Sequence, residues 1–203
     1  MALYKNKYRI ESARWHNWNY ANAAAYYVTI CTKDRAHFFG TCVRERMCLN
    51  EIGALAWQFW QEIPQHFPHV QLDQFVIMPN HVHGIIIIQP SPVETLHCNV
   101  STITHCNVSA IKQCSVSTSQ TNNFNQKMSE ISPKSGSLST IIRSYKSACS
   151  KHIRLQFPEA KFAWQSRFHD RVIRNEQEYY AIANYIHDNP KNWNKDELYI
   201  SSP

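Results

Sequence analysis

Two strands joined by a short turn, with a pair of histidines, are predicted by residues 76–88, which run Val76-Ile77-Met78-Pro79-Asn80-His81-Val82-His83-Gly84-Ile85-Ile86-Ile87-Ile88. The β-branched run after Gly84 indicates a buried central strand, and Pro79-Asn80 indicates a tight connection. Residues two apart on a strand point to the same face, so His81 and His83 emerge side by side. Two neutral imidazoles form half of a divalent-metal site, although histidines that only line a sheet give the same pattern.

Hydrophobic periodicity around this stretch predicts an α+β fold. Amphipathic helices are expected at 49–67 and 138–155, with Ser137 as N-cap of the second, and a last helix at 176–189 ends before Pro190. Strands are expected at 26–32, 70–78, 82–89 and 162–173. The resulting order is the ferredoxin-like split βαβ pattern with an extra C-terminal helix. It predicts an antiparallel sheet with helices on one face.

Residues 91–136 differ in composition from the rest of the single domain expected over 1–203. They are rich in Ser, Thr, Asn and Gln, and His97-Cys98-Asn99-Val100-Ser101-Thr102 recurs as His105-Cys106-Asn107-Val108-Ser109-Ala110. Repeat proteins use units of roughly 20 or more residues, so we interpret the segment as a polar, disordered insertion. Zinc binding by its His/Cys pairs is the less favoured alternative, because no closed-site spacing is present.

The net charge of the 203-residue chain is +6, and the basic excess is concentrated in residues 137–175. Basic side chains interleaved with aromatic rings suit a DNA surface, since phosphates bind cations and unpaired bases stack on rings. The alternative for the basic side chains is an ordinary solvated surface. The alternative for Trp164 and Phe168 is packing in the protein core. The predicted DNA-binding residues are Arg143, Lys146, Trp164, Arg167, Phe168, Arg171 and Arg174.

The chain carries no sign of a membrane or secreted protein. No run of about 18 apolar residues is present, and the N-terminal residues contain no apolar stretch like that of a signal peptide. The seven cysteines include no Cys-x-x-Cys pair, so neither a disulfide framework nor a zinc knuckle is indicated. We expect a cytoplasmic protein with reduced thiols.

Four motifs in order resemble a known family. The stretch Met78-Pro79-Asn80-His81-Val82-His83-Gly84 is similar to the His-hydrophobic-His signature of the HUH endonucleases. It is followed by Ile141-Ile142-Arg143-Ser144-Tyr145-Lys146-Ser147-Ala148, by Trp164-Gln165-Ser166-Arg167-Phe168-His169-Asp170-Arg171-Val172-Ile173-Arg174-Asn175 and by Tyr185-Ile186-His187-Asp188-Asn189-Pro190. The series resembles the REP-associated tyrosine transposases over nearly the whole chain except the insertion.

The resemblance implies a ferredoxin-like fold and cleavage of single-stranded or hairpin DNA at repetitive extragenic palindromes. It implies that Tyr185 is the nucleophile and that His81, His83 and Asn189 bind one divalent metal ion, Mg²⁺ or Mn²⁺. Tyr185 and Asn189 are four residues apart on the predicted last helix and therefore share a face. The family usually has phenylalanine at the position of Tyr145, which makes Tyr145 a rival nucleophile. The protein is expected to be a monomer or a homodimer.

Two other functions remain open at this point. One is a non-cleaving DNA hairpin-binding protein domesticated from a transposase. The other is a relaxase-like or replication-initiator-like HUH nickase, for which Tyr179-Tyr180 would supply the second tyrosine. The four residues His81, His83, Tyr185 and Asn189 favour the transposase.

Overall fold

The computed structural model describes residues 18–90 and 134–199 of the chain. The repeats and most of the predicted insertion, residues 91–133, lie outside the described residues. Of the predicted insertion, only Lys134–Gly136 is described, and it leads into the helix that begins at Leu138. None of the helices in 18–90 and 134–199 has both the length and the hydropathy that a bilayer-spanning segment needs.

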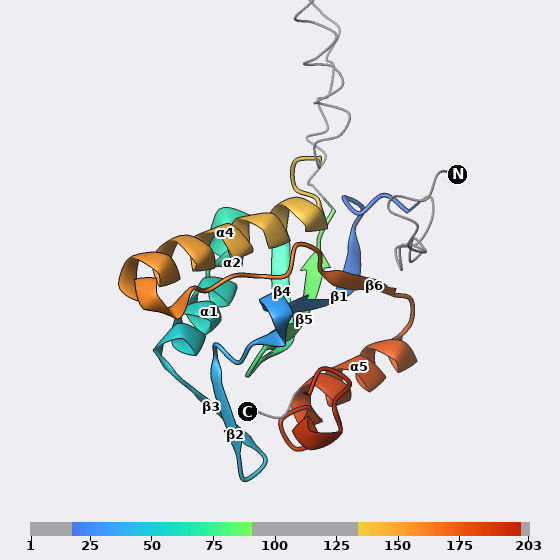
Figure 1. Ribbon diagram of the computed structural model, residues 1–203. Helices are drawn as coiled ribbons and strands as arrows, with labels where there is room; N and C mark the ends of the chain where they lie inside the picture. The colour runs from blue at the N-terminus through green and yellow to red at the C-terminus, as the bar shows by residue number, and fades with distance from the viewer. Residues whose placement is uncertain (1–17, 91–133, 200–203) are drawn as a thin grey trace, which may run out of the picture. The chain divides into compact units, whose positions relative to one another are not determined.

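Four strands form the predicted antiparallel sheet, in the order β4-β5-β1-β6 (Figure 1). They are β1 (Ala24–Cys31), β4 (Val70–Met78), β5 (His81–Ile88) and β6 (His169–Ile173). This order places the third strand of the split βαβ unit between the first two, as the ferredoxin-like pattern requires. The predicted fold class is therefore confirmed.

Strand β5 is buried along nearly its whole length, as the isoleucine run predicts. It pairs with β1 on one side and β4 on the other, and the turn at Pro79-Asn80 joins it to β4. Alternate side chains of β5 therefore face two different layers of the protein.

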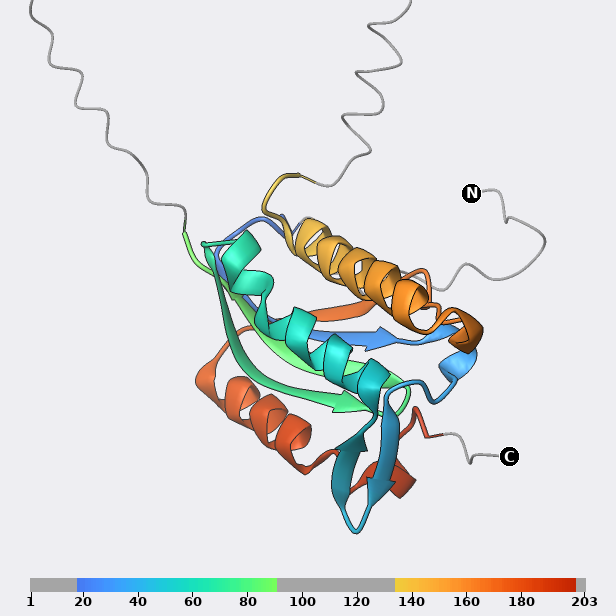
Figure 2. The ribbon, with the colours of Figure 1, turned by 90° about the vertical axis from the view of Figure 1, so that its left-hand side faces the viewer.

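The helices of the split βαβ pattern lie on one face of the sheet, as predicted, and the extra C-terminal helix covers the other face (Figure 2). On one face lie α1 (Glu51–Gln61), α2 (Ile63–His66) and α4 (Leu138–Gln156), and on the other lies α5 (Glu176–Asp188). Gly84 allows α1 to pack closely, because a Cβ at this position would lie 2.3 Å from the Trp60 ring. His83, the neighbour of Gly84, faces the opposite layer, where its ring contacts the Tyr185 ring of α5. The extra C-terminal helix thus covers the histidine face of the sheet.

A second, two-stranded sheet was not predicted. It is the hairpin of β2 (Gly40–Val43) and β3 (Arg46–Leu49). Its turn residues Arg44 and Glu45 have positive φ values of 49° and 63°. Hairpin turns of this kind usually contain Asn or Gly, so the sequence lacks the expected turn signal.

Two other predicted elements are interrupted, the first at the proline that the sequence places inside it. The helix predicted at 49–67 is interrupted at Glu62, because Pro64 lies in the first turn of α2 and does not continue the ladder of α1. The strand predicted at 162–173 is regular only in β6, and Trp164 makes an isolated bridge with Thr32.

Ser137 is the N-cap residue of α4, but its side chain makes no capping hydrogen bond. Short 3-10 turns lie at Lys33–Arg35, Pro158–Ala160 and Trp193–Lys195.

Candidate metal and tyrosine site

The two histidines of β5 lie side by side and are almost completely shielded from solvent. His81 is 0% exposed and His83 is 2% exposed, and their ring centroids are 4.4 Å apart. The Nε2 atom of each ring is buried and has no hydrogen-bond partner. Buried polar atoms are almost always paired, so two adjacent unpaired nitrogens indicate a site for a ligand.

Asn80 determines which nitrogen of His81 carries the proton. Its amide nitrogen donates to the carbonyl oxygens of Arg35 and Leu198, at 3.1 and 2.9 Å. Its Oδ1, which only accepts, therefore faces His81 Nδ1 at 2.7 Å. The proton is on Nδ1, and Nε2 presents a lone pair. A hydrogen bond to the second ring nitrogen is the usual support of a metal-binding histidine.

His83 has similar support from two hydroxyl groups of β1. Its Nδ1 lies 2.9 Å from Thr29 Oγ1 and 2.7 Å from the Tyr27 hydroxyl, and both can accept a hydrogen bond from Nδ1–H. Burial lowers the pKa of His81 to about 3 and lowers the pKa of His83 well below its usual value. Both rings are therefore neutral, as metal ligation requires.

Helix α5 brings the predicted tyrosine and asparagine to the same place. The Tyr185 ring lies 5.4 Å from the His83 ring, and its hydroxyl donates to Asp196 Oδ2 at 3.1 Å. Asn189 follows one turn later and is 1% exposed. Its Nδ2 donates to the same oxygen of Asp196 at 2.8 Å, while its Oδ1 is buried without a partner. The four site residues predicted from the sequence thus converge.

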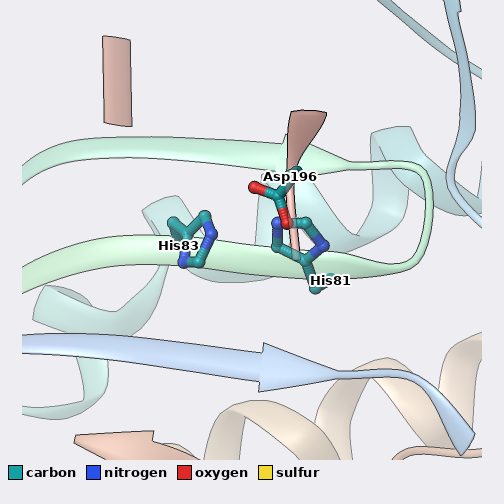
Figure 3. A group of neighbouring side chains, drawn as sticks. All are labelled: His81, His83 and Asp196. Atoms are coloured by element: carbon teal, nitrogen blue, oxygen red, sulfur yellow. The ribbon is translucent and has the colours of Figure 1, made fainter. Parts of the chain in front are cut away.

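Asp196 was not predicted. It accepts hydrogen bonds from Tyr185 and Asn189, and it lies beside His81 and His83 (Figure 3). One carboxylate oxygen and one ring nitrogen from each of His81 and His83 lie within 4.8 Å of one another. The C-terminal turn reaches the site by folding back, with the Trp193 ring 5.8 Å from the His81 ring. A carboxylate in an aperiodic segment has no distinctive sequence signal, so only the tertiary contact reveals its place.

The donor set fits a divalent cation. Two imidazole nitrogens and an amide oxygen are buried without partners, and a carboxylate stands beside them. Mixed nitrogen and oxygen ligands suit Mn²⁺ and related ions, and the oxygen ligands also suit Mg²⁺. The positive charge would be balanced by Asp196, and each unpaired atom would gain a partner.

Tyr185 combines access to solvent with a protonated hydroxyl. Its side chain is 46% exposed, and its hydroxyl donates to the half-buried Asp196. Burial and the neighbouring Asp196 carboxylate raise the pKa of Tyr185 well above its usual value. The phenol is therefore neutral at pH 7, and it requires a proton acceptor or a nearby positive charge to become a strong nucleophile.

A scan against protein-family models finds no match for the chain. An uncharacterized protein of Haemophilus influenzae is 33% identical over 191 residues, which cover 93% of this chain and 92% of that protein. The chain belongs to the same family as this protein. The relationship therefore extends over nearly the whole length of both family members, and it assigns no activity to either.

The fold is also present in a solved structure of a REP-associated tyrosine transposase bound to a REP hairpin. The TM-score is 0.50 and the identity 15%, and the similarity covers 89% of this chain and 74% of the other. At this identity the comparison establishes that the chain shares its fold with that protein.

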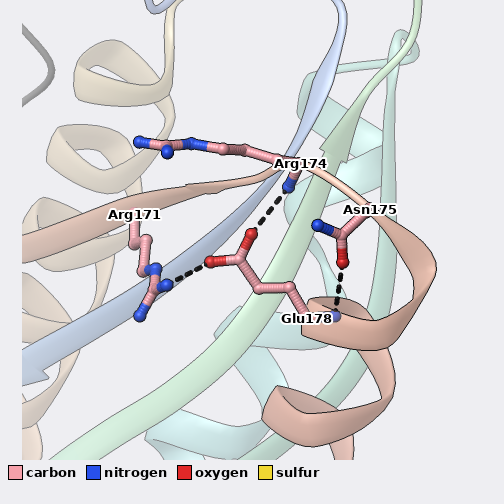
Figure 4. A network of polar contacts seen from close by, with 4 residues as sticks. All are labelled: Arg171, Arg174, Asn175 and Glu178. Atoms are coloured by element: carbon pink, nitrogen blue, oxygen red, sulfur yellow. Dashed lines mark hydrogen bonds and ion pairs between the residues drawn. The ribbon is translucent and has the colours of Figure 1, made fainter.

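The predicted DNA-binding cations have different surroundings. Arg143 and Arg167 are exposed. The Lys146 ammonium donates to the carbonyl oxygens of Gln165 and Ser166, at 2.6 and 3.4 Å. Figure 4 shows the last two: Arg171 pairs with Glu178 at 2.5 Å, and the same carboxylate accepts from the backbone nitrogen of Arg174 at 2.9 Å.

The predicted aromatic residues of the DNA surface pack against the protein core. Trp164 contacts the rings of Phe39, Phe162 and Tyr145, and its Nε1 donates to the Lys146 carbonyl at 3.2 Å. Phe168 is partly buried against the same core. The structure therefore favours the core alternative for Trp164, because a ring that packs against three other rings and donates from its nitrogen has little surface for a base. The partial burial of Phe168 favours the same alternative.

Tyr145, the rival nucleophile, is buried between α4 and α1. It is 2% exposed, and its hydroxyl donates to the Ala56 carbonyl at 3.1 Å. The neighbouring Trp60 ring lies across the sheet from the histidine face. A phosphodiester cannot reach this hydroxyl without opening of the core.

Proposed function

We propose that this protein is a metal-dependent transposase and endonuclease of single-stranded DNA, which cleaves and rejoins palindromic hairpin DNA through a 5′-phosphotyrosine at Tyr185. One observation carries the proposal: a tyrosine with a half-exposed side chain lies beside three buried ligand atoms that have no hydrogen-bond partner. These atoms belong to His81, His83 and Asn189. The common fold with a hairpin-bound tyrosine transposase supports the same assignment.

The metal site has defined roles for its residues. His81, His83 and Asn189 would hold Mg²⁺ or Mn²⁺, with Asp196 beside them. The bound ion would polarise the scissile phosphate and offset negative charge in the transition state. Asn80, Thr29 and Tyr27 keep the histidine lone pairs directed at the site by their hydrogen bonds to the other ring nitrogens.

Tyr185 would perform the covalent step. Its Oη forms a bond to phosphorus and passes its proton to the Asp196 carboxylate that already accepts its hydrogen bond. The bond from phosphorus to the 3′ oxygen breaks, and that oxygen takes up one proton to become a free 3′-hydroxyl. Asp196 Oδ2 already accepts the phenolic hydrogen bond and holds the ring beside His83. The phosphotyrosyl link preserves the energy of the broken bond, so a 3′-hydroxyl can reverse the step without ATP.

The choice of a tyrosine transposase over a two-tyrosine nickase rests on Tyr179 and Tyr180. The Tyr179 hydroxyl donates to Asp73, and Tyr180 is 62% exposed and packs on the Tyr179 ring. Neither tyrosine shares the Asp196 contact of Tyr185. The arrangement therefore favours a single nucleophile.

The experiment uses end-labelled single-stranded palindromes from the host genome, incubated with the full chain and with or without Mn²⁺. We expect a covalent protein–DNA adduct that requires metal and disappears in Tyr185→Phe, while hairpin binding persists. Tyr180→Phe is the matched control and should form the adduct. Hairpin binding without an adduct in the wild-type protein would instead identify a non-cleaving binding protein. An adduct retained in Tyr185→Phe would refute the nucleophile.

A further inference from the structure

Helix α5 carries the site tyrosine but buries little of its own surface. Of its 13 residues only Ile186 is buried. In comparison, α4 buries six residues against the other face of the sheet. Since the apolar face of a helix normally holds it on its sheet, polar contacts contribute a larger share to the position of α5 than to that of α4.

One set of polar contacts attaches the first turn of α5 to β6. The Asn175 side chain accepts from the Glu178 nitrogen at 2.8 Å and caps the helix (Figure 4). The Glu178 carboxylate accepts from the backbone of Arg174 and pairs with Arg171 of β6. The Arg171 side chain is 69% exposed, so this ion pair is screened by solvent and contributes little.

A second contact attaches α5 to the other edge of the sheet. The pairing of β4 with β5 shifts register between Leu72 and Phe75. A bulge of this kind redirects a side chain. Asp73 lies within the shift, its Oδ1 accepts from the Gln74 nitrogen at 2.7 Å, and its Oδ2 accepts from the Tyr179 hydroxyl.

The Glu178 and Tyr179 contacts attach α5 to opposite edges of the sheet. Strands β4 and β6 are the two edges of the sheet, and the histidines lie on β5 between them. Glu178 and Tyr179 are neighbours in sequence, yet they reach opposite edges. The rotation of α5 about its own axis is therefore opposed from both sides, and Tyr179 supplies the constraint on the side of β4.

We propose that the Asp73–Tyr179 hydrogen bond positions Tyr185 over the histidine pair. This role rests on the proposed function, since positioning matters only if Tyr185 reacts. Side-chain atoms lie about 5–6 Å from a helix axis, so a rotation of about 10° moves the Tyr185 hydroxyl by about 1 Å. A misplacement of about 1 Å can lower a reaction rate about 100-fold. Asp73 and Tyr179 touch neither the histidines nor the DNA in this mechanism and are positioning residues.

The test compares Tyr179→Phe with Tyr180→Phe in the full chain. Each change removes one hydroxyl from adjacent tyrosines, and within the described residues the Tyr180 hydroxyl makes no hydrogen bond. The first measurement is amide hydrogen exchange without DNA or metal. We expect Tyr179→Phe to speed exchange of the amides in 183–188 about tenfold, as loss of one hydrogen bond predicts, without a change in β5. Tyr180→Phe should match the wild type.

The second measurement is the single-turnover rate of adduct formation at saturating DNA and Mn²⁺. Tyr179→Phe should slow it about 10- to 100-fold with the same hairpin Kd. Asp73→Asn, whose amide oxygen still accepts a hydrogen bond, should restore most of the rate relative to Asp73→Ala. A merely structural role would lower the melting temperature and change exchange in β5 as well.

Each outcome has a distinct meaning. Equal exchange in Tyr179→Phe and Tyr180→Phe would overturn the proposal, as would faster exchange in α5 with an unchanged rate of adduct formation. If the wild-type protein forms no adduct, the proposed function fails. The exchange comparison then decides alone whether the Asp73–Tyr179 hydrogen bond fixes the end of α5 that carries Tyr185.

Discussion

Lowering the pH from 7 to 5 without metal should destabilise the protein through His81. Its side chain is 0% exposed, and burial lowers its pKa to about 3. In the unfolded chain a histidine has a pKa of about 6.5. Between these values the unfolded state binds a proton that the folded state excludes, so the free energy of unfolding rises with pH and is lost as the pH falls below about 6.5.

The expected magnitude follows from the same values. One pKa unit corresponds to about 1.4 kcal/mol, and pH 5 lies about 1.5 units below the unfolded value, which gives about 2 kcal/mol for His81. His83 is buried beside it and changes in the same direction. The two contributions are coupled because the rings are in contact. A loss of about 2 kcal/mol is a large part of the stability of a single domain.

The assay is urea unfolding in EDTA at pH 7 and pH 5, for the wild-type protein and for His81→Gln. The variant lacks the titrating ring, so its free energy of unfolding should change by about 2 kcal/mol less between the two pH values. His66→Gln, which removes an exposed imidazole, controls for the loss of a histidine as such. Parallel pH dependence of wild-type and His81→Gln proteins would refute the reasoning, since it would mean that His81 is not held neutral by burial.

Three further predictions concern the surface and the insertion. Trp164→Ala should lower the melting temperature by several degrees, because removing a packed aromatic ring costs about 3–5 kcal/mol when it is fully buried and part of that for the partly buried Trp164. Weaker DNA binding at an unchanged melting temperature would instead indicate stacking on a base. Arg167→Ala should leave the melting temperature unchanged and reduce the log–log salt slope of single-strand binding by about 0.7; an unaltered slope removes this residue from the DNA surface. Replacing residues 91–133 with a short Gly/Ser linker should preserve melting temperature and nicking, because both flanks of the segment hydrogen-bond to His69 and lie close together. A large loss of stability would show that the segment packs on the domain.

The elements with strong periodicity were predictable because their signals are local. The isoleucine run predicted the buried strand β5, and the apolar residues at helical spacing predicted the buried face of α4. The hairpin β2–β3 was missed, because Arg44 and Glu45 form its turn without the usual turn residues. The strand predicted from residue 162 was too long, because its first half satisfies its hydrogen bonds and its aromatic packing outside a regular ladder.

The candidate site likewise has a part that the sequence predicts and a part that only the folded structure shows. Spacings of two on a strand and four on a helix place His81 with His83 and Tyr185 with Asn189, so the sequence by itself determined these pairs. Only the tertiary structure determined that the pairs meet and that Asp196 joins them. Local spacing specifies the direction of side chains within one element, whereas contacts between elements depend on how the chain folds back, as the C-terminal turn does over His81. The same reason explains why Asp73, more than 100 residues from Tyr179 in sequence, has no signal outside the folded protein.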